Sequence, residues 1–420
     1  MLRAMADRGQ PTRDENDRSA AIGGGISSGL VGLLAVASGA TVANMYYSQP
    51  LLHTLGRAFH VSNTTAGLLF TISQAGFVLG LALLVPLGDL HERRGLISTT
   101  MLVTSAALTV TALAPGVAVF GAAIAVVGFT SVMAQVIVPM SSSLSREHER
   151  GRVVGTVMSG LLIGILTART VSGLLTAAVG WRFVFWFAAA VMLVMAVTLR
   201  RTLPRVPPTT AVPYRTLLRS ILTLIASEPV LRQRMMLAAL TFGCFSTLWT
   251  PLSFLLSAAP FHYGNAVIGL FGLAGVAGAG AASFAGRLAD RGHLGRTTTT
   301  ILLMLASWAL LAAGSTSVVA LLAGIVVLDL GAQGLHISNQ NAIYALSPDA
   351  RSRLTTAYMV AYFIGGATFS AISSAVYDSN GWDGVCVLGA GIALAALVVW
   401  ALTEAGRVRT AGGRPRPAGD

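Results

Sequence analysis

Four polar side chains share one face of an otherwise apolar segment. They are Asp329, Gln333, His336 and Gln340, spaced i, i+4, i+7 and i+11. This spacing forms a single stripe if the segment is helical. A carboxylate in apolar surroundings can take up and release a proton, and an imidazole can do the same. The stripe therefore predicts a proton-transfer site at Asp329, with His336 as the second candidate.

The composition places this stripe inside a membrane. Hydrophobic residues make up 54% of the 420 residues and charged residues only 10%, and the mean hydropathy is +0.72. A soluble domain cannot bury so much apolar surface, whereas about 20 apolar residues in a helix cross a bilayer. Twelve such runs are predicted near 29–52, 64–87, 96–114, 117–140, 153–177, 181–199, 235–256, 265–284, 297–313, 318–343, 354–376 and 382–403.

The sequence repeats itself at a constant offset of 201 positions. Scarce residue types recur in register: Pro50-Leu51 at Pro251-Leu252, Asp89 at Asp290 and Gly180-Trp181 at Gly381-Trp382. Two related halves are expected. The predicted organisation is a tail at 1–27, a six-helix bundle at 28–200, a linker at 201–234 with one amphipathic surface helix, a second bundle at 235–404 and a tail at 405–420.

The positive charges predict the orientation. All 28 basic residues are arginine, and all but Arg57, Arg169 and Arg182 lie in the tails and in alternate loops. Loops rich in arginine remain in the cytoplasm, so both termini are expected there. The net charge of +12 is then explained by topology and anionic lipid, and no basic soluble domain is left to bind nucleic acid. We expect a multi-pass protein of a bacterial plasma membrane.

Arg169 is expected to lie inside the fifth predicted span. A guanidinium there costs about 2.5 to 3.5 kcal/mol on insertion scales and requires a partner. Asp329 is the one acid placed inside a span, at a similar depth in the tenth. One hypothesis is that Arg169 lowers the proton affinity of the group it faces, and the alternative is a static ion pair that holds the two halves together.

The loops after the second and eighth spans carry a family signature. Residues 86–94 read PLGDLHERR and residues 286–292 read GRLADRG, which resembles the loop between helices two and three in the major facilitator superfamily. The first copy departs from the signature at Val85 and Glu92, where the family has glycines. The resemblance implies a conformational latch formed by the residues Asp89, Arg93, Arg94, Gly286, Asp290 and Arg291. The alternative is a charged turn that only anchors the topology.

The fifth span has small residues at the spacing of the antiporter motif of this superfamily. Gly155, Gly164 and Gly173 match its glycines and predict close helix packing, while Arg169 replaces its proline. The resemblance also implies that the first, fourth, seventh and tenth helices line a central cavity. Besides the stripe, the cavity candidates are Asn44, Tyr46, Tyr47, Gln49, Gln135, Trp249, Tyr358 and Tyr362, which suit an organic, partly apolar solute; packing or interface anchoring is the alternative for each.

These observations favour a carrier over an enzyme. The spans hold one isolated acid rather than a catalytic cluster, the two cysteines predict no disulfide or metal site, and no lysine exists for a nucleotide-binding loop. Within the superfamily the sequence is most similar to bacterial drug and sugar efflux permeases. This resemblance implies an all-α protein that exports a small organic solute, such as a drug, metabolite or sugar, against protons by alternating access. It would be a monomer in the lipid bilayer without cofactor or metal. The alternatives are uptake by proton symport or facilitation, and a membrane sensor on a transporter scaffold.

Overall fold

The computed structural model describes residues 26–206, 213–275, 293–347 and 350–412. Within these ranges every regular element is a helix. The first half contains α2 (Ser28–Ala43), η1 (Gln49–Leu51), α3 (Leu52–Phe59), α4 (Asn63–Leu83), α5 (Leu87–Leu90), α6 (Arg93–Leu113), α7 (Val117–Thr130), η2 (Ser131–Met133), α8 (Ala134–Ser143), η3 (Glu147–Glu149), α9 (Arg150–Ala178) and α10 (Trp181–Thr202). The second contains α12 (Pro229–Trp249), α13 (Leu252–Ser257), α14 (Asn265–Leu270), α16 (His293–Ala313), α17 (Val318–Tyr344) and α18 (Arg351–Gly412).

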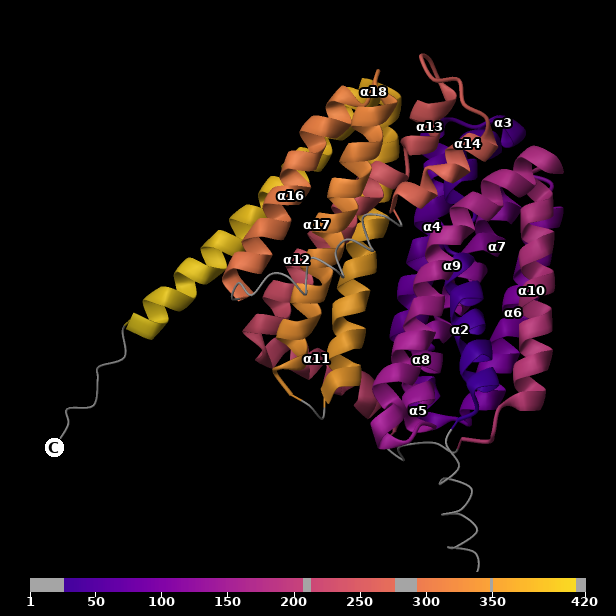
Figure 1. Ribbon diagram of the computed structural model, residues 1–420, viewed down its shortest axis with the longest axis vertical. Helices are drawn as coiled ribbons and strands as arrows, with labels where there is room; N and C mark the ends of the chain where they lie inside the picture. The colour runs from indigo at the N-terminus through magenta and orange to yellow at the C-terminus, as the bar shows by residue number, and fades with distance from the viewer. Residues whose placement is uncertain (1–25, 207–212, 276–292, 348–349, 413–420) are drawn as a thin grey trace, which may run out of the picture.

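These helices account for twelve transmembrane segments in two six-helix bundles. Nine helices among the described residues are long and apolar enough to cross a membrane, and Ser28–Ala43 and Asn265–Gly275 are shorter apolar helices. One of the nine, α18, joins two spans across a break at Gly381. The bundles stand side by side in Figure 1, indigo to magenta for the first half and rose to yellow for the second.

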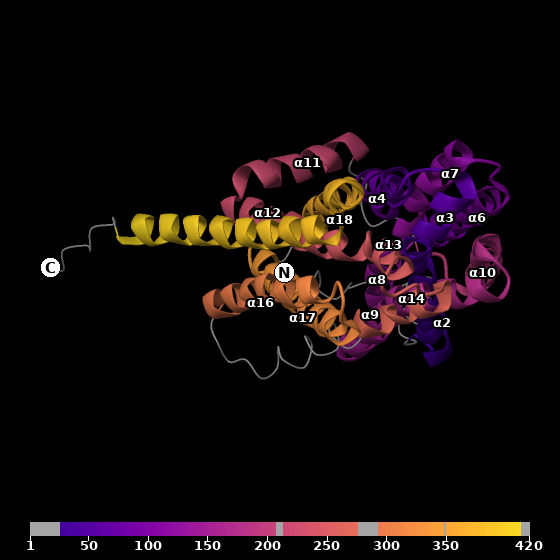
Figure 2. The same cartoon turned by 90° about the horizontal axis from the view of Figure 1, so that it is seen from above.

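The linker between the bundles forms the helix α11 (Tyr214–Ser227). Seen from above, α11 lies lengthwise while α4 is viewed nearly along its axis (Figure 2). The sequence predicted an amphipathic surface helix in this segment. Together α5 and α11 mark one end of the molecule, called here the linker end, whereas α3 and α13 mark the opposite end (Figure 1).

The offset repeat of the sequence corresponds to repeated backbone geometry. Gly180 and Gly381 both have positive φ, +112° and +62°, and each directly precedes a tryptophan that begins or continues a helix. Glycine adopts positive φ without the steric penalty of a side chain, so both helix connections need it. Pro50 and Pro251, also related by the offset, both follow interrupted helices.

Side-chain hydrogen bonds join the two bundles at the opposite end of the molecule. Asp378 of α18 accepts hydrogen bonds from the backbone N–H of Thr64 (2.7 Å) and from its hydroxyl (2.5 Å), at the start of α4. Thr54 donates to the Asn265 side chain at 2.8 Å. A carboxylate at a helix N-terminus is favourable because the first N–H groups have no helical partner. These contacts close the opposite end.

Replacing Asp378 by Asn should loosen this closed end. A charge-assisted bond at a helix N-terminus contributes about 1 kcal/mol, so we expect a roughly fivefold shift toward separated bundles. Distances between spin labels at Ala58 and Ala258, both exposed at this end, would report it. Asp383→Asn removes an exposed acid of the same helix, for which the structure shows no hydrogen bond to any described residue, and serves as the control. Equal distance distributions in the two variants would contradict the role of Asp378.

Close helix packing involves two of the three glycines selected from the sequence. A methyl group on Gly164 would lie 2.2 Å from the Gly39 carbonyl oxygen of α2, and one on Gly173 would lie 2.3 Å from that of Asn265. Gly155 differs, because a methyl group there would meet no described atom within 4 Å. The close approach of α9 to α2 therefore depends on Gly164 and not on Gly155.

Gly164→Ala should lower thermal stability, because α2 and α9 must move apart to accept the methyl group. Overpacking typically costs about 1 to 3 kcal/mol. Gly155→Ala is the matched control in the same helix, and it should leave stability unchanged or slightly raised because alanine favours helix. Thermal unfolding of the purified variants in detergent measures both. An unfolding temperature for Gly164→Ala equal to that of Gly155→Ala would rule out the constraint.

Candidate functional site

Two helix interruptions, related by the repeat, bring polar groups into the interior. The helix α2 ends at Ala43, and a turn leads to η1, which begins at Gln49. In the second half α12 ends at Trp249 just before Pro251. Proline cannot donate the hydrogen bond that would continue a helix. In membrane proteins such breaks occur where the backbone lines a protein interior, and they direct side chains there.

Arg169 lies at the centre of these interruptions. The residue is only 3% exposed, and its Nε donates a hydrogen bond to the Gln49 Oε1 at 2.7 Å. The guanidinium carbon lies 4.1 Å from the ring centre of Trp249 and 4.9 Å from that of Tyr46. Phe245 adds a third ring at 5.7 Å. Aromatic faces stabilise a desolvated cation, so this aromatic box replaces much of the lost hydration.

Asp329 approaches the same tryptophan from the second half. Its carboxylate, 4% exposed on a residue basis, accepts a hydrogen bond of 3.3 Å from the indole Nε1 of Trp249. A methyl group on Gly275 would lie 2.6 Å from the Asp329 Oδ2. The absence of a side chain at Gly275 thus leaves room for the carboxylate.

Trp249 connects the two charged residues. Its ring faces Arg169 and its N–H points to Asp329. Within the described chain the two side chains form no ion pair at 4.0 Å or less. The arrangement therefore differs from the static salt bridge considered as an alternative. Both charges are held, but neither neutralises the other by direct contact.

His336 belongs to a second group nearer the linker end of α17. Its Nδ1 is 3.0 Å from the hydroxyl of Tyr358, and its ring centre is 4.9 Å from that of Tyr362. Tyr362 stacks on Phe242 at 4.2 Å. A run of rings continues from Phe242 through Phe245 to Trp249, with centre distances of 5.5 and 5.9 Å. Aromatic side chains thus connect the His336 group with the Arg169 group.

The side chains of the other predicted cavity residues make no described hydrogen bond. Both polar atoms of the Asn44 amide are buried without a described hydrogen-bond partner. Tyr47 is buried in the core, where its carbonyl oxygen accepts a bond from Ser172. The remaining three, Gln135, Gln333 and Gln340, are half-buried, and the structure shows no side-chain hydrogen bond for them within its described part.

Several residues that contribute to the interior were absent from the sequence prediction. Phe245 lies four residues before Trp249 in α12, a spacing that could have identified it. Gln74 is fully buried in α4, and neither polar atom of its amide has a described partner. A lone amide in an apolar span was the available signal.

Arg234 corrects the predicted linker, which assigned it to a basic cytoplasmic loop. The helix α12 begins at Pro229, earlier than the predicted span, so Arg234 lies inside the second bundle and is 3% exposed. It donates to the Asn339 side chain at 3.0 Å and packs 4.8 Å from the ring centre of Trp400. Buried partners replace the water that a loop arginine would have.

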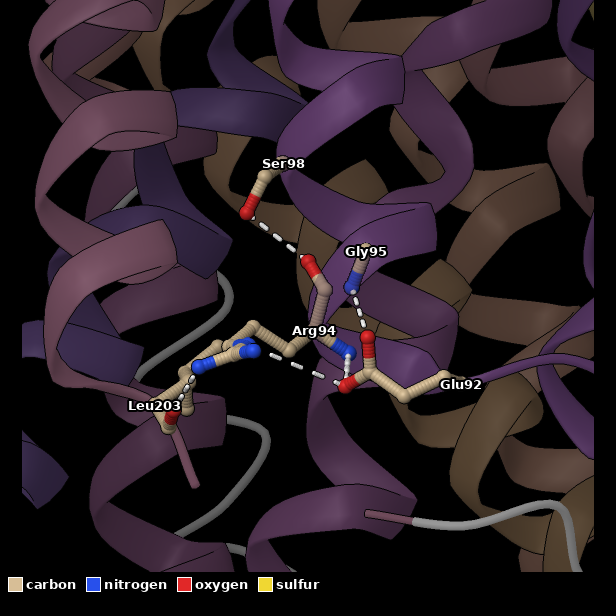
Figure 3. Close-up of polar contacts among 5 residues, drawn as sticks. All are labelled: Glu92, Arg94, Gly95, Ser98 and Leu203. Atoms are coloured by element: carbon tan, nitrogen blue, oxygen red, sulfur yellow. Dashed lines mark hydrogen bonds and ion pairs between the residues drawn. The ribbon is translucent and has the colours of Figure 1, made fainter. Parts of the chain in front are cut away.

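The first copy of the loop signature forms a compact polar cluster at the linker end. Arg93 pairs with Asp89 at 3.1 Å and donates to the Gly88 carbonyl oxygen at 2.9 Å. Glu92, which departs from the family signature, caps α6 by accepting the backbone N–H groups of Arg94 and Gly95 at 3.0 and 2.8 Å (Figure 3). The second copy, with Gly286, Asp290 and Arg291, lies outside the described residues.

Arg94 and Ser98 extend this cluster along α6. The Arg94 guanidinium contacts Glu92 at 3.9 Å and donates to the Leu203 carbonyl oxygen at 3.5 Å, beyond the end of α10 (Figure 3). Ser98 donates to the Arg94 carbonyl oxygen at 2.7 Å. The loop is therefore tied both to its own helix and to the start of the linker. Among the described residues, no group of three or more His, Cys, Asp or Glu side chains is placed to hold a metal ion.

Comparisons with known proteins agree on one family. The model described as Major Facilitator Superfamily matches residues 34–307. The chain is 49% identical to the "Uncharacterized transporter YgaY" of Escherichia coli O157:H7 over 376 residues, covering 89% of this chain and 95% of that protein. It is 32% identical over 359 residues to the "Probable transporter SCO4007" of Streptomyces coelicolor, with coverage of 85% and 83%.

A solved structure shares the fold at low sequence identity. It is the inward-facing, unoccupied form of a bacterial homolog of the human lysosomal transporter Spinster. The match has a TM-score of 0.69 and 14% identity and covers 93% of this chain and 99% of that one.

Substitutions at Trp249 should separate its two contacts. Trp249→Phe keeps a ring against Arg169 but loses the bond to Asp329, at a cost of about 1.5 to 3 kcal/mol. Trp249→Leu should cost roughly a further 0.5 to 2 kcal/mol because the cation–π contact is lost as well. Unfolding in detergent gives the ranking. The matched controls are Trp186→Phe and Trp186→Leu, because Trp186 is 42% exposed. Equal losses of stability in these variants would show that only the volume of the aromatic side chain matters.

Proposed function

This chain belongs to the major facilitator superfamily of membrane transporters, and we propose that it couples the movement of a small organic solute to protons. Asp329 is the group that takes and releases the proton in this proposal. The observation that supports it is a buried carboxylate with one described hydrogen bond, close to Arg169 but without a direct ion pair. The ionised form is compensated by the cation, and the protonated form needs no counter-charge. His336, joined to Tyr358, is the second candidate.

The two ends of the molecule supply the contacts for alternating access. In the described state the bundles are joined at the opposite end through Thr64 and Asp378. The linker end carries the latch cluster of Asp89, Arg93 and Arg94. We propose that the site opens toward the linker end in this state and that rocking of the bundles exposes it to the other side.

The orientation proposed for this cycle follows the arginines. Arg93, Arg94, Arg200 and Arg201 lie at the linker end, whereas Arg57 and Arg182 lie at the opposite end. We therefore propose that the linker end and both termini lie in the cytoplasm of a bacterium, with the protein in the plasma membrane. A monomer remains our expectation for the oligomeric state.

Two directions of transport are compatible with the proposed coupling. Export by proton exchange is supported by the small residues Gly164 and Gly173 of α9, which have the spacing of the antiporter motif. Uptake by proton symport is the alternative. The Arg169 Nη2, which is buried without a described partner, is a donor that a solute could use while Asp329 carries a proton. In exchange, solute and proton must exclude one another, whereas in symport they must bind together.

The test is proton movement in proteoliposomes that contain the purified protein and an internal pH dye. Amphiphilic cations, carboxylates, antibiotics and sugars are added in turn to the wild type and to Asp329→Asn. We expect at least one solute to move protons in the wild type and none to do so in the variant, and the sign of the pH change gives the direction. Asp383→Asn controls for the loss of an acid. Equal coupling in Asp329→Asn and the wild type would remove Asp329 from the mechanism.

A further inference from the structure

The guanidinium of Arg169 has a donor that the protein leaves unused. Its Nε is bound to Gln49, but its Nη2 is buried and has no hydrogen-bond partner among the described residues. The Nε2 of Gln49 is in the same situation. A buried donor without a partner is unfavourable, and more so when it carries charge. Since Gln49 Oε1 and Arg169 Nε hold the two side chains together, their free N–H groups belong to one cluster.

Asp329 does not satisfy these donors. Its carboxylate is bound to the indole N–H of Trp249. The other acids among the described residues lie in loops and near helix ends. What the donor pair lacks is an acceptor with negative charge. A carboxylate has two oxygens and can accept from both the guanidinium and the amide.

The residues around Arg169 indicate the rest of the molecule that would carry such a carboxylate. The rings of Tyr46, Phe245 and Trp249 border the guanidinium. Phe242 and Tyr362 continue this aromatic surface toward the linker end. The ring centre of Phe242 lies 5.5 Å from that of Phe245 and 4.2 Å from that of Tyr362. Such a surface favours an apolar or aromatic body.

From this geometry we propose that Arg169 and Gln49 form a subsite for the carboxylate of an organic acid with an aromatic or apolar body. The inference rests on the proposed transport function and specifies its substrate class. Arg169 contacts the substrate directly, and Trp249 positions the guanidinium through its ring.

The charges of the site determine how this anion and the proton affect one another. The titratable or charged groups that face the subsite are Arg169 of α9, Asp329 and His336 of α17, Tyr46 after α2, and Tyr362 of α18. Arg169 balances one negative charge, so an ionised Asp329 and a solute carboxylate together leave an excess charge in apolar surroundings. Protonation of Asp329 removes that excess. Anion and proton therefore bind together, which selects symport over exchange.

Binding to the purified full-length protein tests the subsite, with phenylacetate as the probe. Its neutral analogue phenylacetamide and the cation phenethylamine have nearly the same body. We expect the wild type to bind phenylacetate at least tenfold more tightly than either analogue, measured by calorimetry in detergent. Arg169→Gln should lose about tenfold or more of this affinity. Arg182→Gln is the control, because Arg182 also lies over a tryptophan, at 4.3 Å from the Trp181 ring centre. An equal loss in both variants, or a preference for either analogue, would overturn the proposal.

Gln49→Glu covers the case in which Arg169→Gln does not fold. This variant keeps an acceptor for Arg169 and supplies its own carboxylate in place of the solute. It should unfold at a higher temperature than the wild type without ligand, and phenylacetate should no longer stabilise it. Undiminished stabilisation would refute the subsite. Stabilisation of the wild type by chloride alone, equal to that by phenylacetate, would show an inorganic anion site and would refute the organic acid.

A pH series separates the subsite from proton coupling. Phenylacetate affinity should rise as the pH falls in the wild type, whereas Asp329→Asn should bind tightly at neutral pH with little dependence on pH. Phenylacetate binding that needs Arg169 but moves no protons in proteoliposomes would keep the subsite and reject the proposed coupling. Proton movement driven only by cations or sugars would keep the coupling and reject the subsite.

Discussion

A buried guanidinium between two helix bundles is the constraint on which the interior depends. Arg169 would be costly to insert into an apolar region without partners. The partners are a side-chain amide, three aromatic rings and, through Trp249, a carboxylate. They come from both halves of the chain. Because the cation lies in the first half and Trp249 and Asp329 in the second, the site is complete only when the bundles are together.

The internal repeat accounts for the contact between Arg169 and Gln49, and the difference between its two copies accounts for the charge at this site. Under the 201-residue offset Arg169 corresponds to Ser370 and Gln49 to Thr250. Arg169 is bound to Gln49, and the Ser370 hydroxyl is likewise 3.0 Å from that of Thr250. The same contact between a broken helix and its neighbour therefore occurs twice. Only the copy in the first half carries charge.

Much of this architecture could be predicted from the sequence, because span length and apolar composition are sufficient for membrane helices. The twelve segments and the similar depth of Arg169 and Asp329 follow from spacing. The helix breaks do not, because the spans predicted near 29–52 and 235–256 run past the ends of α2 at Ala43 and of α12 at Trp249. The role of Trp249 between the two charges could not be predicted, since periodicity does not give the rotation of one helix against another. Arg234 was assigned to the loop for a related reason. A charged residue near the boundary of a span is predicted to lie in the loop unless its buried partners, such as Asn339, are known.

Charge neutrality connects the site to the proposed cycle. With Asp329 ionised and no solute, the charges of Asp329 and Arg169 balance. With a solute carboxylate on Arg169 and a proton on Asp329, they balance again. The two intermediate forms, with only the anion or only the proton added, carry a net charge into a region of low dielectric, where the cost is largest. Rocking of the bundles is then easiest for the empty and the fully loaded site. In this scheme coupling requires no separate conformational switch. The desolvation cost of one unbalanced charge prevents the bundles from rocking when only the anion or only the proton is bound.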